Sequence, residues 1–120
     1  MNVDQFDGEA KILKALAHPA RLAILELLRK SDQCVCHMEA ALGFRQAYIS
    51  QHLMVLRDAG IVSVRREGWN IYYHVSYTEI FDLLDIVYKL TGKHIQPDLS
   101  LDILDDCTCP RCQVVKHPSR

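Results

Sequence analysis

Apolar residues recur at helical spacing between positions 45 and 60, and the rest of the chain is organised around this segment. Ile49, Leu53 and Leu56 lie at i, i+4 and i+7, which predicts an amphipathic helix with one face in a core. The opposite face offers hydrogen-bonding groups: Gln46, Ser50, Gln51 and Arg57. Such a face suits the major groove of DNA, although a solvated surface helix shows the same pattern.

Three further helices are predicted before this segment, and a hairpin and a last helix after it. The helices span residues 9–17, residues 20–30 with Pro19 in the first turn, and about residues 33–42, capped by Ser31-Asp32 and ended by Gly43. After Gly60 the period becomes strand-like over residues 61–66 and 71–75, with a turn at 67–70. Residues 76–79 form a predicted capping box for a helix that ends at Gly92.

This order of elements predicts a mainly α fold with a β-hairpin, the winged helix-turn-helix. Residues 40–59 would supply the helix-turn-helix and residues 65–70 the wing, so double-stranded DNA is the expected partner. The apolar stripe of the last helix is wider than one small core needs. Together with the first helix, this wide stripe predicts a surface for dimerisation. The alternative is that the extra apolar residues pack into the core. We therefore expect a DNA-binding and dimerisation domain over residues 1–92 and a cysteine-rich tail over residues 93–120.

Charge and cysteine content indicate the expected partner and the expected cellular compartment. The net charge of the 120 residues is −1, but residues 45–70 hold four arginines against two carboxylates, a local patch that suits phosphates. The first ten residues are polar, and no apolar run approaches the ~20 residues of a membrane span. A cytoplasmic protein without a membrane partner is expected, and its five cysteines are expected to be thiols.

Several segments together resemble the ArsR/SmtB family of metal-sensing winged-helix transcriptional repressors. They are LKALAHPARLAILELL at 13–28, Cys-Val-Cys at 34–36, ISQHLMVLRDAGIVSVRREG at 49–68 and IYYHV at 71–75. The resemblance spans roughly residues 13–90. It implies a homodimer formed through the first and last helices, which binds a palindromic operator and releases it when a metal or metalloid binds.

The resemblance also implies which residues face DNA. In the recognition helix they are Gln46, Ser50, Gln51 and His52, with Arg45 at its start, and in the wing they are Arg65, Arg66 and Trp69. Phe44-Arg45-Gln46 replaces the small hydroxyl residues often found at the start of this helix in the family, so the operator sequence does not follow from the resemblance. Two alternatives stay open: His52 as a helix-packing residue, and the two wing arginines as part of a solvated turn.

The cysteines form two groups, Cys34 and Cys36 at the start of the third helix and Cys107, Cys109 and Cys112 in the tail. Residues two apart on an α-helix point about 200° from each other. The first pair could therefore bind one ion only if that turn loosened, the alternative being that the two thiols serve different ions. A helix N-terminus favours the thiolate, the form that binds metal. The linker before the tail cluster could span on the order of 45 Å, enough to reach the pair in either protomer.

Thiolates select soft or borderline ions such as Zn(II) and Cd(II), and the resemblance adds As(III), Pb(II) and Bi(III). Glu39 stands where arsenic sensors of this type often have a third cysteine. Residues 1–17 lack the N-terminal cysteines of cadmium and lead sensors, and the last helix lacks the histidines of zinc sensors. All five cysteines are therefore predicted as ligands. The alternatives are core packing for the first pair, a separate zinc loop for the tail and His37 as an added ligand.

The sequence also suggests two functions other than a metal-responsive repressor. A redox or reactive-sulfur sensor on the same fold would signal through a disulfide or persulfide. An enzyme is suggested only by the CxxC form of Cys109 to Cys112, which lacks the strand–helix context of thiol oxidoreductases. We expect a regulator with no catalytic residues and no small organic substrate.

Overall fold

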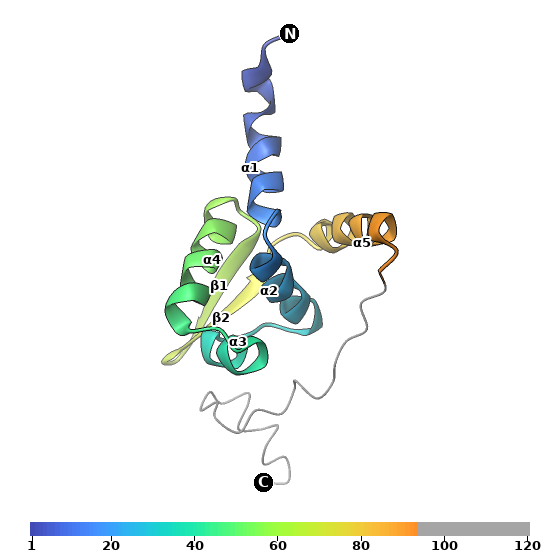
Figure 1. Ribbon diagram of the computed structural model, residues 1–120. Coiled ribbons are helices and arrows are strands. Elements are labelled where there is room, and N and C mark those ends of the chain that lie inside the picture. Colours follow the sequence, from blue (N-terminus) through green and yellow to red (C-terminus); the bar gives the residue numbers. More distant parts are fainter. Residues whose placement is uncertain (94–120) are drawn as a thin grey trace.

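The structure is a computed structural model that describes residues 1–93, and within them five α-helices and one hairpin follow the predicted order (Figure 1). The elements are the 3₁₀ helix η1 (Val3–Phe6), α1 (Asp7–Leu16), α2 (Pro19–Lys30), α3 (Val35–Leu42), α4 (Gln46–Asp58), β1 (Val62–Glu67), β2 (Asn70–Val75) and α5 (Glu79–Thr91). This arrangement confirms the winged helix-turn-helix, with α3 and α4 as the helix-turn-helix and β1–β2 as the wing.

Local signals fix several helix ends, and the roles of Pro19, Gly43 and Gly92 are those predicted, whereas the cap formed by His18 is an additional finding. Pro19 occupies the first turn of α2, where its missing N–H is not needed. The Nδ1 atom of His18 accepts a hydrogen bond from the backbone N–H of Ala20 at 3.1 Å and caps the same helix. Gly43 and Gly92 end α3 and α5 in the left-handed conformation, with φ of 72° and 70°.

The predicted start of α3 is wrong. Gln33 does not begin the helix, because its backbone exchanges two hydrogen bonds with Tyr73 of β2, at 3.1 and 2.7 Å. The following residue, Cys34, is also extended (φ −90°, ψ 163°) and is the N-cap residue in place of the predicted residues 31–32. A contact with a strand about forty positions later thus shortens the helix to Val35–Leu42.

The predicted capping box before α5 is not formed. Thr78 is the N-cap residue, and it makes no side-chain hydrogen bond to the helix. The hydroxyl of Ser76 instead bonds to the hydroxyl of Ser63 on the neighbouring strand. The side chain expected to cap α5 is therefore used to join the two strands at their base.

The hairpin is longer and tighter than predicted. Its register runs from Val62 opposite Val75 to Glu67 opposite Asn70. Only residues 68 and 69 remain for the turn, and a glycine with φ of 63° takes its first position, as two-residue hairpin loops favour. The wing therefore extends well beyond the core.

One core joins α2, α3, α4, β1 and α5. The predicted stripe of α4 is confirmed, since Ile49, Leu53 and Leu56 are at most 2% exposed. The main residues that surround it are Ile24, Leu25 and Leu28 of α2, Met38 of α3, Val62 of β1, and Ile80 and Leu84 of α5. Because α4 is packed on this core along its inner face, its outer face is held in a fixed orientation.

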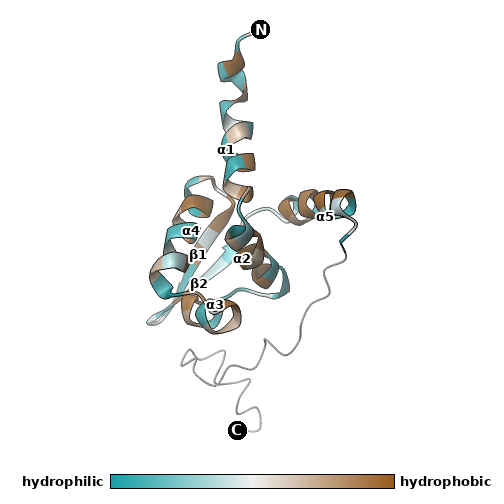
Figure 2. Ribbon diagram, viewed as in Figure 1, coloured by the Kyte–Doolittle hydropathy of each residue, from teal (hydrophilic) through white to brown (hydrophobic). Residues whose placement is uncertain are grey.

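Two helices project from this body, α1 and α5, and both carry exposed apolar residues (Figure 2). They are Ile12 and Leu13 of α1 and Ile86, Val87 and Leu90 of α5, and Phe6 of the preceding η1 is exposed as well. α5 is tied to α2 by polar contacts, in which the Tyr88 hydroxyl donates to Glu26 at 2.7 Å and Arg29 pairs with Asp85 at 2.9 Å. Such exposed apolar surface fits the predicted dimer surface. None of the helices in residues 1–93 has the length and apolar content to cross a membrane.

Candidate nucleic-acid interface and thiol pair

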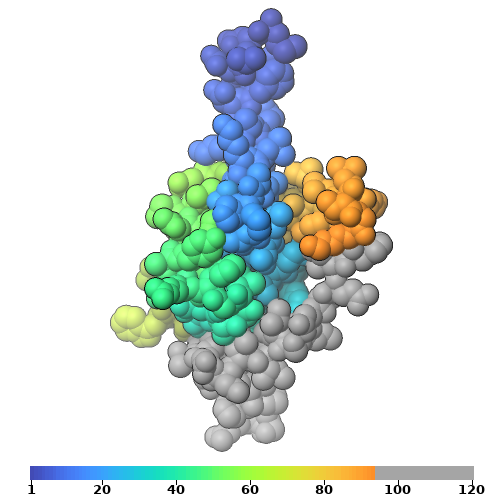
Figure 3. All heavy atoms as spheres, in the orientation of Figure 1, coloured from blue at the N-terminus to red at the C-terminus, as the bar shows by residue number. Residues whose placement is uncertain are grey.

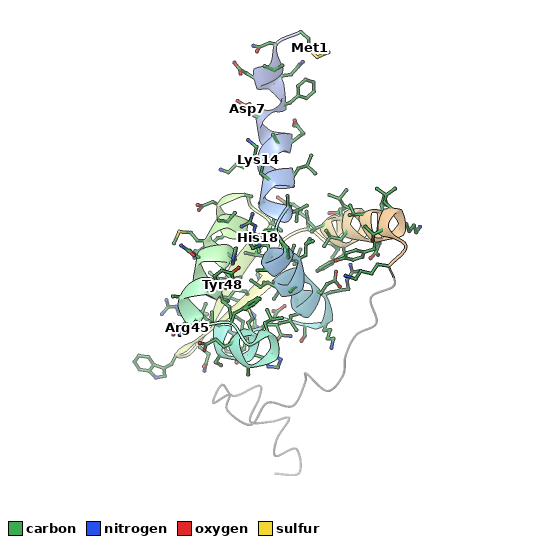
Figure 4. All side chains as sticks on the ribbon, in the orientation of Figure 1. Met1, Asp7, Lys14, His18, Arg45 and Tyr48 are labelled. Carbon is green, nitrogen blue, oxygen red and sulfur yellow. The ribbon has the colours of Figure 1, made fainter. Side chains whose placement is uncertain are left out.

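The outer face of α4 is exposed and polar, as predicted. Gln46, Ser50 and Gln51 are all exposed, and Arg45 precedes the helix as its N-cap residue (Figure 4). No side chain caps this end and no acidic residue lies in the first turn. The first backbone N–H groups of α4 are thus available to an anion such as a DNA phosphate, next to side chains that can reach base edges.

His52 lies on the other side of the helix and does not belong to this face. It is 7% exposed, and its Nδ1 atom is 3.1 Å from Nη1 of Arg21. The rings of His18 and Tyr48 lie on either flank, with centroids at 4.4 and 4.5 Å. Burial, and then the charges of His18 and Arg21, lower the pKa of His52 and so favour the neutral ring. The structure supports the helix-packing alternative for this residue, because its position places it beside the buried stripe.

The two wing arginines differ in their surroundings. Successive residues of a strand point to opposite faces, so Arg65 and Arg66 cannot face the same way. Arg65 pairs with Glu67 at 2.7 Å and Asp32 at 3.3 Å, and the hydrogen bond to Glu67 raises the pKa of its guanidinium. Arg66 is exposed and makes no ion pair within the described part of the chain. Arg66 is therefore better placed to bind a phosphate without first losing a partner.

Trp69 is fully exposed at the tip of the wing. Figure 3 shows the wing and α4 on one side of the body, with α5 on the opposite side. The predicted DNA-facing residues of the wing and of α4 thus share one side of the molecule, His52 excepted. The projecting helix α5 lies away from them.

Cys34 and Cys36 are brought together at the start of α3. Their sulfur atoms are 2.9 Å apart, Cys34 being 6% exposed and Cys36 half-buried. The sequence predicts that the two thiols diverge if both cysteines lie within the first helical turn. This prediction is wrong because Cys34 is the extended N-cap residue, outside the helix. The first turn of α3 does not have to unfold for the sulfurs to meet.

The pair fits part of a site for a soft metal ion. Around a tetrahedral ion with metal–sulfur bonds of about 2.3 Å, two thiolates lie about 3.8 Å apart. The sulfurs would thus have to separate by somewhat less than about 1 Å. Within residues 1–93, no group of three or more His, Cys, Asp and Glu side chains could hold a metal. The other predicted ligands, Cys107, Cys109 and Cys112, lie outside the described residues.

The side chains around His52 were not predicted to act together. Tyr48 lies four residues before His52, so the two occupy one side of the helix, and this spacing is visible in the sequence. Arg21 and His18 come from the start of α2, and no local signal connects them to α4. Their contact depends on how the two helices cross.

Comparison with known proteins gives a consistent result. Residues 18–64 match the family described as bacterial regulatory protein, arsR family. A transcriptional repressor SmtB homolog from Synechocystis is 32% identical over 96 residues, which cover 80% of this chain and 70% of that protein.

Two solved structures are also similar. The homodimeric winged helix-turn-helix DNA-binding domain of a possible ArsR-family regulator from Mycobacterium bovis has a TM-score of 0.69 at 31% identity, covering 78% of this chain and 87% of that one. Reduced HlyU from Vibrio cholerae has a TM-score of 0.65 at 30% identity, covering 75% and 95%.

These relatives are named as regulators of transcription or DNA-binding domains, not as enzymes. The matched residues 18–64 run from the cap of α2 through the thiol pair and the whole of α4 into β1. The similarity therefore covers the fold and the elements that form the interface, and the chain belongs to the ArsR/SmtB family of winged-helix transcriptional repressors.

Proposed function

We propose that this chain is a homodimeric repressor that binds operator DNA and releases it when Cys34 and Cys36 bind a thiophilic ion. The observation behind the proposal is the 2.9 Å separation of the two sulfurs at the start of α3, the helix that leads into α4. Cd(II), Pb(II), Zn(II) and As(III) are the candidate ions. Cys107, Cys109 and Cys112 are proposed as the further ligands.

The position of the pair supports a coupling to α4. On one side, Gln33 is anchored by its backbone bonds to Tyr73 and by a side-chain bond to the carbonyl of Leu27 at 3.3 Å. On the other side, the carbonyl of Cys34 accepts the backbone N–H of Met38 at 3.2 Å, and Met38 is fully buried. A separation of the thiols would therefore pull on the first turn of α3, and α3 packs against α4.

DNA recognition would use the outer face of α4 and the wing. Gln46, Ser50 and Gln51 would reach base edges in the major groove, while Arg45 and Arg66 would bind phosphates. Trp69 at the wing tip would lie against the sugar–phosphate backbone. We expect the repressor to act in the cytoplasm.

A homodimer is proposed through α1 and α5. Their exposed apolar side chains lie away from the face of α4 that would contact DNA, and one similar solved structure is homodimeric. A two-fold dimer would present two α4 helices to half-sites about 34 Å apart, one turn of DNA.

The short distance between the sulfur atoms of Cys34 and Cys36 also favours a second function. Two thiols at 2.9 Å need to approach by less than about 1 Å to form a disulfide of about 2.05 Å. In that reaction a peroxide would take two electrons and two protons from the cysteines and be reduced to water and an alcohol or to two waters. The similar Vibrio protein is described as reduced HlyU. A redox-responsive repressor is therefore the alternative to a metal-responsive one.

An anaerobic titration of the reduced protein with Cd(II), followed by thiolate-to-metal absorption in the ultraviolet, separates these possibilities. The full chain is compared with a chain that ends at residue 106 and with the Cys34→Ser, Cys36→Ser double variant. We expect both changes to weaken binding, because tail and pair would share one site. Two independent, additive signals would contradict the shared site. Reduced protein that does not bind Cd(II) tightly, but releases DNA with peroxide in metal-free buffer, would establish the redox alternative.

A further inference from the structure

Arg21 connects three helices with the three nitrogen atoms of its guanidinium. Its Nε atom donates to the carbonyl of Ala15 at 2.5 Å, and Nη2 donates to the carbonyl of Lys14 at 3.2 Å. Its Nη1 atom lies 3.1 Å from Nδ1 of His52 in α4. Ala15 and Lys14 belong to the last turn of α1, where a cation is favoured; the Lys14 carbonyl also accepts the backbone N–H of Ala17 at 3.2 Å. One side chain of α2 thus joins the end of α1 to the middle of α4.

The joint between α1 and α2 is short. Only residues 17 and 18 separate the helices, and α1 rises from the body beyond that point (Figures 1 and 4). Ala15 and Leu16 are buried at its base, whereas Ile12 and Leu13 are exposed one turn earlier. Few contacts therefore set the direction of α1, and Arg21 provides the hydrogen bonds that reach from it to α4.

His52 is suited to receive this contact. Because Nδ1 accepts a hydrogen bond from the guanidinium, the neutral ring carries its own proton on Nε2. That atom is buried and has no hydrogen-bond partner among the described residues. The ring is held between His18 and Tyr48, so the acceptor is fixed in place. A protonated ring could not accept from Arg21 and would place a second cation beside it.

In a two-fold dimer formed through α1 and α5, the angle between α1 and α4 contributes to the distance between the two recognition helices. A helix of ten residues is about 15 Å long, so a rotation of roughly 10° at its base moves the far end by about 2.6 Å. Two protomers would double this to about 5 Å, more than the ~3.4 Å step between base pairs. A small change at the joint would therefore alter which half-site spacing the dimer fits.

We propose that Arg21, through its bonds to α1 and His52, is a positioning residue that fixes the half-site spacing read by the dimer. The proposal rests on the proposed function, because it requires a dimer that binds DNA. It concerns spacing alone and is independent of the identity of the inducer.

The test uses duplexes selected from a random pool by the wild-type chain of 120 residues. Binding is measured by fluorescence anisotropy for the selected duplex, for versions with one base pair added or removed between half-sites, and for one half-site alone. We expect wild type to prefer the selected spacing by on the order of tenfold, the usual cost of one poorly fitted base-pair position.

Arg21→Lys keeps the charge but cannot make three forked bonds. We expect it to reduce the spacing preference to less than about threefold, with single half-site affinity and the dimer dissociation constant changed by less than about twofold. His52→Phe keeps the ring packing, removes the acceptor and should give the same result, which keeps the test valid if one variant does not fold. Lys14→Gln is the matched control, because Arg21 bonds to the carbonyl of Lys14 and not to its side chain.

Two results would overturn the proposal. In the first, the folded variants discriminate between spacings as wild type does. In the second, affinity falls equally for all duplexes and the single half-site, which identifies Arg21 as a residue of general stability. A failure of the proposed function is visible separately, since wild type would then neither form dimers nor select a duplex.

Discussion

The two faces of α4 separate stability from recognition on a single helix. The inner face carries Ile49, Leu53 and Leu56 in the core, whereas Ser50 and Gln51 on the outer face are exposed. A substitution on the inner face removes buried contacts, and one on the outer face leaves the core intact. The helix can therefore present variable side chains to DNA while its position is set by residues that never meet the ligand.

The largest expected effect comes from the inner face. Leu53→Ala should lower the free energy of unfolding by about 2–5 kcal/mol, because it removes a side chain that is 2% exposed and leaves a cavity. Urea denaturation measures the change. Met54→Ala is the matched control on the same helix, since Met54 is 64% exposed and should cost less than about 1 kcal/mol. Equal losses for the two variants would refute the assignment of faces.

Substitutions on the outer face should weaken DNA binding and leave the free energy of unfolding almost unchanged. Ser50→Ala and Gln51→Ala are each expected to weaken binding to the selected duplex by about 1–3 kcal/mol, the usual value of a base contact. Their unfolding free energies should stay within about 0.5 kcal/mol of wild type. The two quantities are measured by anisotropy and urea denaturation. Unchanged DNA affinity in both variants would mean that this face is only solvated surface.

Much of this helix could be predicted from the sequence, because the signals are local. The stripe that starts at Ile49 is periodic, and Gly43 marks the end of the helix before it. His52 follows Ile49 by three residues and precedes Leu56 by four, so its place beside the stripe was also open to prediction. The family resemblance favoured DNA contact instead.

The start of α3 could not be predicted in the same way. It depends on the pairing of Gln33 with Tyr73, a contact between distant parts of the chain. The close approach of Cys34 and Cys36 follows from that pairing, because it keeps Cys34 out of the helix. The contact of Arg21 with His52 likewise requires the crossing of two helices. Local patterns predicted elements and exposed faces, whereas these contacts depend on tertiary packing.

Substitution of the wing arginines should have a smaller effect, which is seen in how DNA affinity depends on salt. Arg66→Ala should reduce the slope of log affinity against log salt by about 0.9, as expected for one lost phosphate contact. Arg65→Ala should reduce it by less, because Arg65 already pairs with Glu67 and Asp32. Anisotropy titrations at several salt concentrations measure both slopes. A larger reduction for Arg65→Ala would show that it exchanges its partners for DNA.

The smallest expected effect concerns the titration of His52. Its pKa in the folded protein lies below the usual 6.5, so the unfolded chain binds a proton first as the pH falls. The contribution to stability is full above about pH 6.5 and is lost as the pH falls towards the lowered value. His18, Arg21 and Tyr48 surround the ring. Urea denaturation from pH 8 to 5 should show a weaker loss of stability for His52→Phe than for wild type, and parallel curves would contradict the assignment.

The central claim is that the thiol pair at the start of α3 controls the position of α4. Its most direct test is release of the fluorescently labelled selected duplex from reduced protein, measured by anisotropy as Cd(II) is added without oxygen. We predict that Cd(II) weakens binding by wild type about 5–150-fold, the range of typical coupling energies, and leaves the Cys34→Ser, Cys36→Ser variant bound. Release from both proteins at the same Cd(II) concentration would contradict the claim.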